Sequence, residues 1–171
     1  MARVRGSGAA GGGMSLRIIE NTTERGLKAL ADRLKAGEFY VKVGVPDSPA
    51  MNEDGSENRE VTVSDTMTWL EFGTKFAPER PIFRNGIRKN IGELQRLGKV
   101  NLLLIAQGQV TISYALGLMG ALAAGRIKQE FGSSDLAPNR QSTIDRKGSS
   151  RPGIDTAQTK NSVTWEVIGY D

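Results

Sequence analysis

The sequence predicts an α+β fold, in which a small antiparallel β-sheet packs against several helices, two of them long. Alternating apolar residues predict strands at 39–45 and 163–169. Apolar residues at spacings of three and four predict the helices, most clearly at 110–131. The length of 171 residues suits one domain, which we place at 15–171.

The N-terminal segment is expected to contain an arm, a short strand and a helix. Residues 1–14 are rich in glycine, which loses the most entropy on folding, so they are expected to form a flexible arm. A short strand from Leu16 through Ile19 is expected to precede a helix at 21–36, which Asn21 caps and Gly37 ends. The apolar stripe of this helix consists of Leu27, Leu30, Ala31 and Leu34.

A second helix is expected after the first long strand. Residues 46–60 are polar and acidic, and predict a solvated loop. Ser64 and Asp65 are expected to cap a helix that runs to Leu70 and stops at Gly73. The side chains of this helix expected to face inward are Thr66, Trp69 and Leu70.

The remaining helices follow Pro81, which suits the first turn of a helix because its missing N–H is not needed there. The apolar pattern then continues towards residue 106, and Gly98 or Gly108 is expected to kink or break it. Small residues in the helix at 110–131 predict a close backbone contact, either within the chain or between subunits. Residues 132–161 show no apolar period and predict an extended loop or arm.

Composition narrows the possible chemistry. The chain has no cysteine and no histidine, so disulfides, thiolate chemistry and the commonest metal ligand and general base are absent. A G-x-G-x-x-G spacing at 6–11 lacks the preceding strand that a dinucleotide site requires. We therefore expect no enzyme activity and no cofactor, although carboxylate, lysine or tyrosine chemistry stays possible.

A turn between two predicted helices contains residues suited to a stiff loop. Gly73 can adopt the positive φ that stops a helix, and Phe72 is expected to be a hydrophobic anchor beside it. Glu71 is positioned to pair with Arg80 or Arg84 as the chain turns back. Two prolines limit the freedom of the same loop. The turn is therefore either a well-made connection or a docking loop.

A second stiff segment is predicted within the polar region before the last strand. Its residues of interest are Lys147, Arg151, Pro152, Ile154, Asp155 and Thr156. The proline restricts the backbone, and the last two residues are good helix caps. The two cations could bind phosphate groups or hold the loop by salt bridges, and both interpretations stay open.

We call residues 70–84 the first phrase and residues 147–156 the second phrase. In this order, the two phrases resemble the tail-component family of siphophages, the neck or tail-completion proteins. The family pattern has Asn-Glu-Phe-Gly-Thr at a helix end, then Pro-x-Arg-Pro-Phe-Leu-Arg, and later Lys-Gly-Ser-x-x-Pro-Leu-Ile-Asp-Thr-Gly. The resemblance covers about residues 38–168. The matching residues are Glu71, Phe72, Gly73, Thr74, Pro78, Arg80, Pro81, Arg84, Lys147, Gly148, Pro152, Ile154, Asp155 and Thr156. The departures are Leu70, Ile82, Phe83, Gly153 and Ala157.

The resemblance implies a structural virion protein that forms a ring, most simply a hexamer, at the phage head–tail junction. Its implied partners are further copies of the chain, the connector or head-completion protein, and the tail terminator or tube protein. Genomic double-stranded DNA would pass through the ring with transient, non-specific contact. No membrane contact is implied, and the implied location is the virion, after assembly in the host cytoplasm.

Other function classes stay open. A tail terminator ring, which caps the tail tube, differs from a neck ring in the partner it binds. A nucleic-acid-binding module is supported by a pI near 9.5 and by basic stretches at 84–99 and 140–160. The net charge of +4 is low for a dedicated nucleic-acid binder. An enzyme ranks last, because no convergent nucleophile and base can be nominated.

Overall fold

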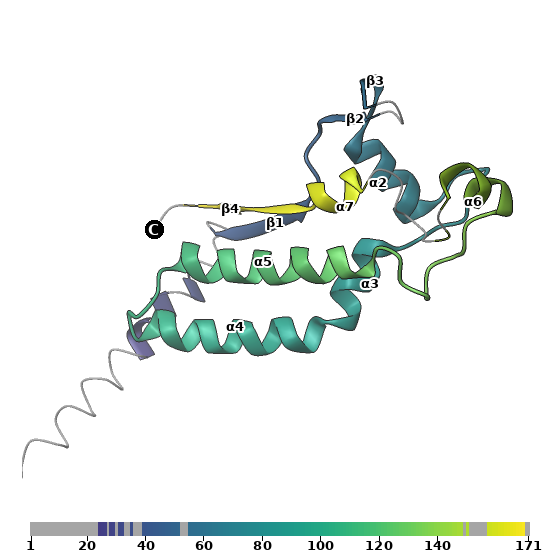
Figure 1. Cartoon of the computed structure of the whole chain (residues 1–171). Helices are drawn as coiled ribbons and strands as arrows, with labels where there is room; N and C mark the ends of the chain where they lie inside the picture. The colour runs from purple at the N-terminus through teal and green to yellow at the C-terminus, as the bar shows by residue number, and fades with distance from the viewer. Residues whose placement is uncertain are drawn as a thin grey trace, which may run out of the picture.

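The structure is a mixed α+β fold, as the sequence predicts, built around a pair of long helices. The computed structural model describes residues 24–26, 28–29, 31–32, 35, 39–51, 55–148, 150 and 157–169. Its elements, in chain order, are β1 (Tyr40–Gly44), β2 (Pro49–Met51), β3 (Glu57–Thr62), α2 (Val63–Phe72), α3 (Ile82–Lys89), α4 (Ile91–Ala106), α5 (Ile112–Glu130), α6 (Gln141–Lys147), α7 (Gln158–Ser162) and β4 (Thr164–Ile168). Helix α5 lies between helix α4 and the strands β1 and β4 (Figure 1).

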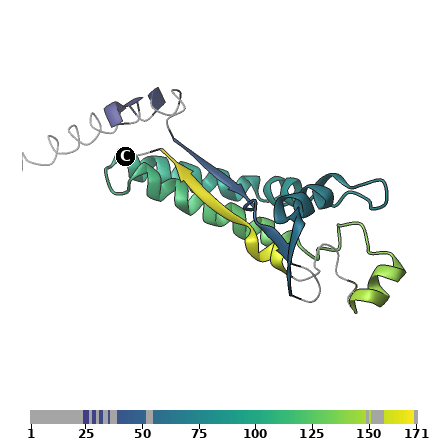
Figure 2. The ribbon, with the colours of Figure 1, turned by 90° about the horizontal axis from the view of Figure 1, so that it is seen from above.

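Strands β1 and β4 form an antiparallel pair, although they come from opposite ends of the described chain. Tyr40 lies opposite Ile168, and Gly44 lies opposite Thr164. The predicted alternation is confirmed, since Phe39 is buried and Val43 packs against the main core, while Tyr40 is exposed. The last strand therefore returns to the first, and both lie on α5 (Figure 2).

Helix α5 supplies the centre of the main hydrophobic core. Ile127 is fully buried there, and a Cβ on Gly86 of α3 would lie 2.8 Å from its Cα. Gly120 contacts the sheet, because a Cβ there would lie 2.6 Å from the Trp165 ring. This confirms a close contact within the chain at Gly120. Gly117, in contrast, faces open space.

Two segments that the sequence predicts as loops contain regular structure. In the predicted loop 46–60, β2 and β3 form an antiparallel hairpin with an irregular register after Pro49. The Gln158 side chain accepts the N–H of Met51 at 2.8 Å and donates to the Pro49 carbonyl at 3.1 Å, so a distant residue stabilises the hairpin edge. The segment 132–161, predicted as an arm, includes α6 and α7.

Two helix boundaries also differ from the prediction. Thr62 is the N-cap of α2, in place of Ser64, and Asp65 takes part in the cap as predicted: the Thr62 hydroxyl accepts the N–H of Asp65, whose carboxylate accepts the Thr62 N–H in return. The break between α3 and α4 occurs at Asn90, where the side chain donates to the Gly86 carbonyl, and Gly98 lies within α4. Gly108, with φ +70°, follows the end of α4, where a break is predicted.

The N-terminal predictions are covered only in part. The arm at 1–14, the strand at 16–19, Asn21 and Gly37 lie outside the described residues. Within 21–36, every described position is helical. No helix in the described part of the chain is both long and apolar enough to span a bilayer.

Candidate functional site

The loop that joins α2 to α3, residues 73–81, carries the first of the two sequence phrases. It lies at the end of the molecule away from the C-terminus (Figures 1 and 2). Gly73 begins it with φ +74°, and a Cβ there would lie 2.8 Å from the Glu79 nitrogen. Glycine is therefore required at this position for two reasons: the backbone has a positive φ, and there is no room for a Cβ. The predicted helix stop at Gly73 is confirmed.

Thr74 closes a short turn inside the loop. Its backbone N–H donates to the Ala77 carbonyl at 2.9 Å, and its hydroxyl accepts the N–H groups of Phe76 and Ala77. Such side-chain bonds fix a turn without help from neighbouring elements. The backbone of the loop is thus set mostly by local contacts.

Glu71 and Arg84 connect the two ends of the loop. The buried Glu71 carboxylate accepts the backbone N–H groups of Phe83 and Arg84, at 2.9 and 3.1 Å, at the start of α3. It also accepts the Arg84 Nε–H at 3.0 Å. Glu79 bonds the same guanidinium at 3.1 Å. These hydrogen bonds, Glu71 first and then Glu79, raise the pKa of Arg84, so it stays charged.

Arg80 does not pair with Glu71. It is buried, which lowers the pKa of its guanidinium, and it holds a different segment. Its Nε donates to the Ala137 carbonyl at 2.8 Å, and a terminal nitrogen donates to the Pro138 carbonyl and the Asn139 side chain. Of the two predicted partners of Glu71, Arg84 is correct and Arg80 is wrong.

Three aromatic side chains lie exposed around this loop, and we call them the aromatic tip: Trp69, Phe72 and Phe76. Their exposed fractions are 48%, 69% and 73%. The predictions that Trp69 faces inward and that Phe72 is an anchor are therefore wrong, because Met67 and Leu70 fill the inward positions of α2. The Arg84 guanidinium lies 5.6 Å from the Phe72 ring, and Lys75 lies 5.8 Å from that of Phe76.

The remaining candidates of the first phrase have simple positions. Pro81 precedes α3, and its carbonyl accepts the N–H of Asn85. Pro78 is exposed in the loop. Sequence reasoning missed Phe76 and Glu79, although an isolated phenylalanine beside a lysine, outside any apolar period, is a usable signal of an exposed anchor.

The second phrase is described only at its edges. Lys147 ends α6, and Gly148 caps it with φ +63°. Arg151, Pro152, Ile154, Asp155 and Thr156 lie outside the described residues. Ala157 has φ +61°, a left-handed angle that favours glycine. This is the position where the family pattern has glycine, so the departure occurs at a strained residue.

Cations of the basic stretch 84–99 are partly neutralised by other elements. The Lys89 ammonium lies 2.6 Å from Asp135 and 2.8 Å from Glu130, and these carboxylates raise its pKa. Arg84 pairs with Glu71 and Glu79, as described above. Glu93, in the same stretch, accepts two hydrogen bonds from Arg126 of α5. The Nε and one terminal nitrogen of the guanidinium each donate to one carboxylate oxygen at 2.7 Å.

The described residues contain no group of three or more Asp or Glu side chains placed to hold a metal ion. What the loop offers instead is a stiff backbone that exposes aromatic surface, which suits binding. Comparison with known proteins gives no match to a family model, to a curated protein or to a solved structure.

Proposed function

We propose that this chain is a ring-forming structural subunit at the head–tail junction of a long-tailed bacteriophage, and that its aromatic tip docks onto a neighbouring subunit or ring. The observation that supports this most is the α2–α3 loop. Its backbone is held by Gly73, Thr74 and the Glu71–Arg84 bonds, while its aromatic side chains are exposed. The same residues carry the resemblance to the neck and tail-completion family.

The physical argument concerns the cost of binding. Trp and other large aromatic side chains supply much of the energy at protein interfaces, because they bury a large area with few rotatable bonds. A loop that is already ordered loses little further entropy when it docks. The aromatic tip meets both conditions, whereas a loop with no partner would ordinarily bury its phenylalanines.

The charge distribution favours a conduit over a DNA clamp. Arg84 and Lys89 already bond carboxylates within the chain. Each phosphate contact releases counterions and adds affinity, so a clamp needs many unpaired cations along one surface. Pairing of these cations favours transient contact with passing DNA.

The test is a phage that encodes this chain with the gene deleted, examined by electron microscopy. The proposal predicts full heads and tails of normal length that remain separate, and joining when purified protein is added to the mixed lysates. Joining by the Phe76→Ser protein should be impaired, whereas Thr68→Ser, an exposed position on α2, should join normally. Normal infectious particles from the deletion would refute the proposal.

Two other results would favour the alternatives. Tails of abnormal length would indicate a terminator ring. Tight DNA binding by the purified chain in a filter assay, with a steep loss as salt rises, would indicate a nucleic-acid-binding module. Weak, sequence-independent DNA binding would agree with the proposed ring.

A further inference from the structure

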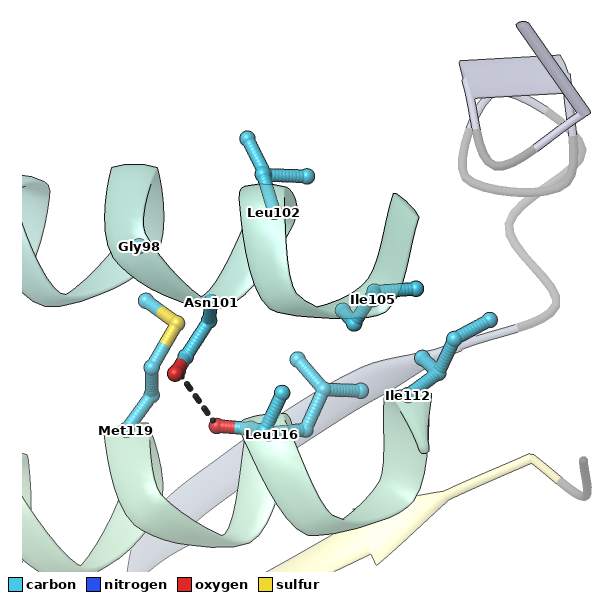
Figure 3. A pocket seen from close by; sticks show the side chains of 8 residues that line it. Gly98, Asn101, Leu102, Ile105, Ile112, Leu116 and Met119 are labelled. Atoms are coloured by element: carbon cyan, nitrogen blue, oxygen red, sulfur yellow. Dashed lines mark hydrogen bonds between the residues drawn. The ribbon is translucent and has the colours of Figure 1, made fainter. Parts of the chain in front are cut away.

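An apolar groove runs along one side of the helix pair α4 and α5. A hollow of about 210 Å³ lies between the two helices near their connection (Figure 3). A second hollow, of about 360 Å³, continues it towards α3 and β1. Gly98 and Met119 line both hollows, so the two form one groove. Ile91 lines one end and is 49% exposed, and Leu102 lines the other and is 39% exposed.

The groove calls for an apolar occupant. Its first hollow contains one polar side chain, Asn101, which is buried and donates to the Ala115 carbonyl at 3.1 Å (Figure 3). The polar atom is therefore already bonded, and the rest of the lining is hydrocarbon, the glycine Cα and the Met119 thioether. A continuous apolar groove with no unpaired polar side chain in its first hollow is suited to an apolar partner.

The dimensions of the groove fit a helix of the length predicted at 21–36. From Ile91 to Ile105, α4 extends about 22 Å, at roughly 1.5 Å per residue. A helix over residues 21–36 extends about 24 Å by the same measure. The small residue Gly98 at the centre lets another backbone approach closely.

The segment 21–36 also has the matching chemistry. Its leucines at 27, 30 and 34 fall at helical spacing on one side, and the charged residues fall elsewhere. Among its described residues, Glu24, Arg25, Lys28 and Asp32 are exposed. A helix with one apolar stripe needs a surface against which to bury it, and the groove is such a surface.

None of the described residues of this segment lines either hollow of its own chain. Its described helical residues lie beside the end of the α4–α5 pair where the two helices connect (Figures 1 and 2). Gly26 lies against the last residue of α4: a Cβ added to Gly26 would lie 3.2 Å from the Ala106 carbonyl oxygen. Phe39, just after the segment, is buried against Ile112 and fixes the chain at that end. The described part of the segment therefore lies at that end of the helix pair and leaves the groove of its own chain open.

We propose that residues 21–36 of one copy form an amphipathic helix that fills the α4–α5 groove of the next copy. The helix and the groove are different surfaces of one chain, so the contact is heterologous, and it closes into a ring when the rotation between copies permits. This inference rests on the proposed ring function and names the contact that would close the ring. It is separate from the aromatic tip, which lies at the other end of the molecule.

Cross-linking tests the proposal directly, because the chain has no cysteine of its own. Leu30→Cys is placed in one chain and Gly98→Cys in a second chain of different size, and the mixture is oxidised. At Gly98 an added Cβ meets Met119 at an ordinary 3.7 Å, so the substitution is tolerated. We expect a disulfide between positions 30 and 98 of different chains. Gly117→Cys, outside the groove, is the matched control and should give none.

A second measurement does not depend on disulfide geometry. The pair Leu30→Asn and Leu34→Asn should raise the concentration at which the oligomer dissociates by roughly a hundredfold, measured by analytical ultracentrifugation. The pair Lys28→Asn and Lys35→Asn, on exposed positions, should change it less than about threefold.

The outcomes separate this inference from the proposed function. A bond within one chain in the Leu30→Cys, Gly98→Cys double variant, with none between chains, would show that the segment occupies its own groove, and would overturn the inference. A ring that forms with no bond at all would also overturn it. Neither result affects head–tail joining, which the gene deletion tests by itself.

Discussion

Glu71 and Arg84 bond each other across the α2–α3 loop, with the Glu71 Oε1 3.0 Å from the Arg84 Nε and an Arg84 terminal nitrogen 2.8 Å from the Glu71 backbone carbonyl. The arginine thus holds both the side chain and the backbone of the last turn of α2. Because the same carboxylate accepts two N–H groups at the start of α3, one residue fixes the angle between two helices.

Replacement of Glu71 by glutamine should destabilise the protein measurably. The amide keeps the shape but loses the charge and one acceptor, which leaves buried donors unpaired at about 1–3 kcal/mol. Glu79→Gln is the matched control: it alters an exposed partner of the same arginine and should cost less than about 1 kcal/mol. Urea unfolding measures both. Equal losses from the two variants would contradict this account of the loop.

Gly120→Ala should destabilise the contact between α5 and the sheet. The new Cβ would lie 2.6 Å from Trp165 and 2.8 Å from Val41, so the strands must shift, at a cost of about 1–3 kcal/mol. Gly117→Ala, on the same helix but facing open space, should stabilise by about 0.5–1 kcal/mol. Opposite signs in thermal or urea unfolding are the expected result. A neutral Gly120→Ala would mean that the sheet lies farther from α5 than described.

Arg80→Met should loosen residues 137–139 without unfolding the core. The variant keeps an apolar stem, but the carbonyl groups of Ala137 and Pro138 lose their donors. We expect faster amide hydrogen exchange in that segment and little change in α5. Arg88→Met, whose described bond is to Asn85 in its own helix, is the control. Unchanged exchange near residue 137 would count against the anchoring role.

Asp65 should give the protein a component of acid sensitivity. The backbone N–H of Thr62, and then its hydroxyl, hold the pKa of Asp65 below its ordinary value of 3.8. Its contribution is therefore fully present above the unfolded pKa and is lost as pH falls through the lower folded pKa. The melting temperature of Asp65→Asn should lie below that of wild type at pH 7, and the gap should close towards pH 2.5. A gap in melting temperature that widens as the pH falls would mean that folding raises the pKa of Asp65, contrary to this account.

The regular elements with a clear apolar period could be predicted from the sequence. The sequence predicts the ends of helix α5 and of strands β1 and β4 to within about two residues. It also predicts that the last strand returns to the sheet, where it pairs with β1. Each is specified by side chains that must be buried, such as Ile127 and Val43. Local pattern is sufficient where the core decides the structure.

The elements that sequence reasoning missed are held by polar contacts between distant residues. The β2–β3 hairpin edge is bonded by Gln158, more than a hundred residues away, and no local pattern reports such a bond. The orientation of α2 depends on Met67, which occupies the core in place of Trp69. Met67 and Trp69 lie on different sides of one helix, and only the packed neighbours decide which side faces the core.

The pairing of β1 with β4 also bears on the timing of folding. Strand β1 leaves the ribosome first, and more than a hundred further residues are made before its partner β4. Local helix formation takes about a microsecond, whereas synthesis proceeds at roughly 5–20 residues per second. The helices between the two strands are therefore ready long before this sheet can close, and the synthesis of β4 is the step that permits it.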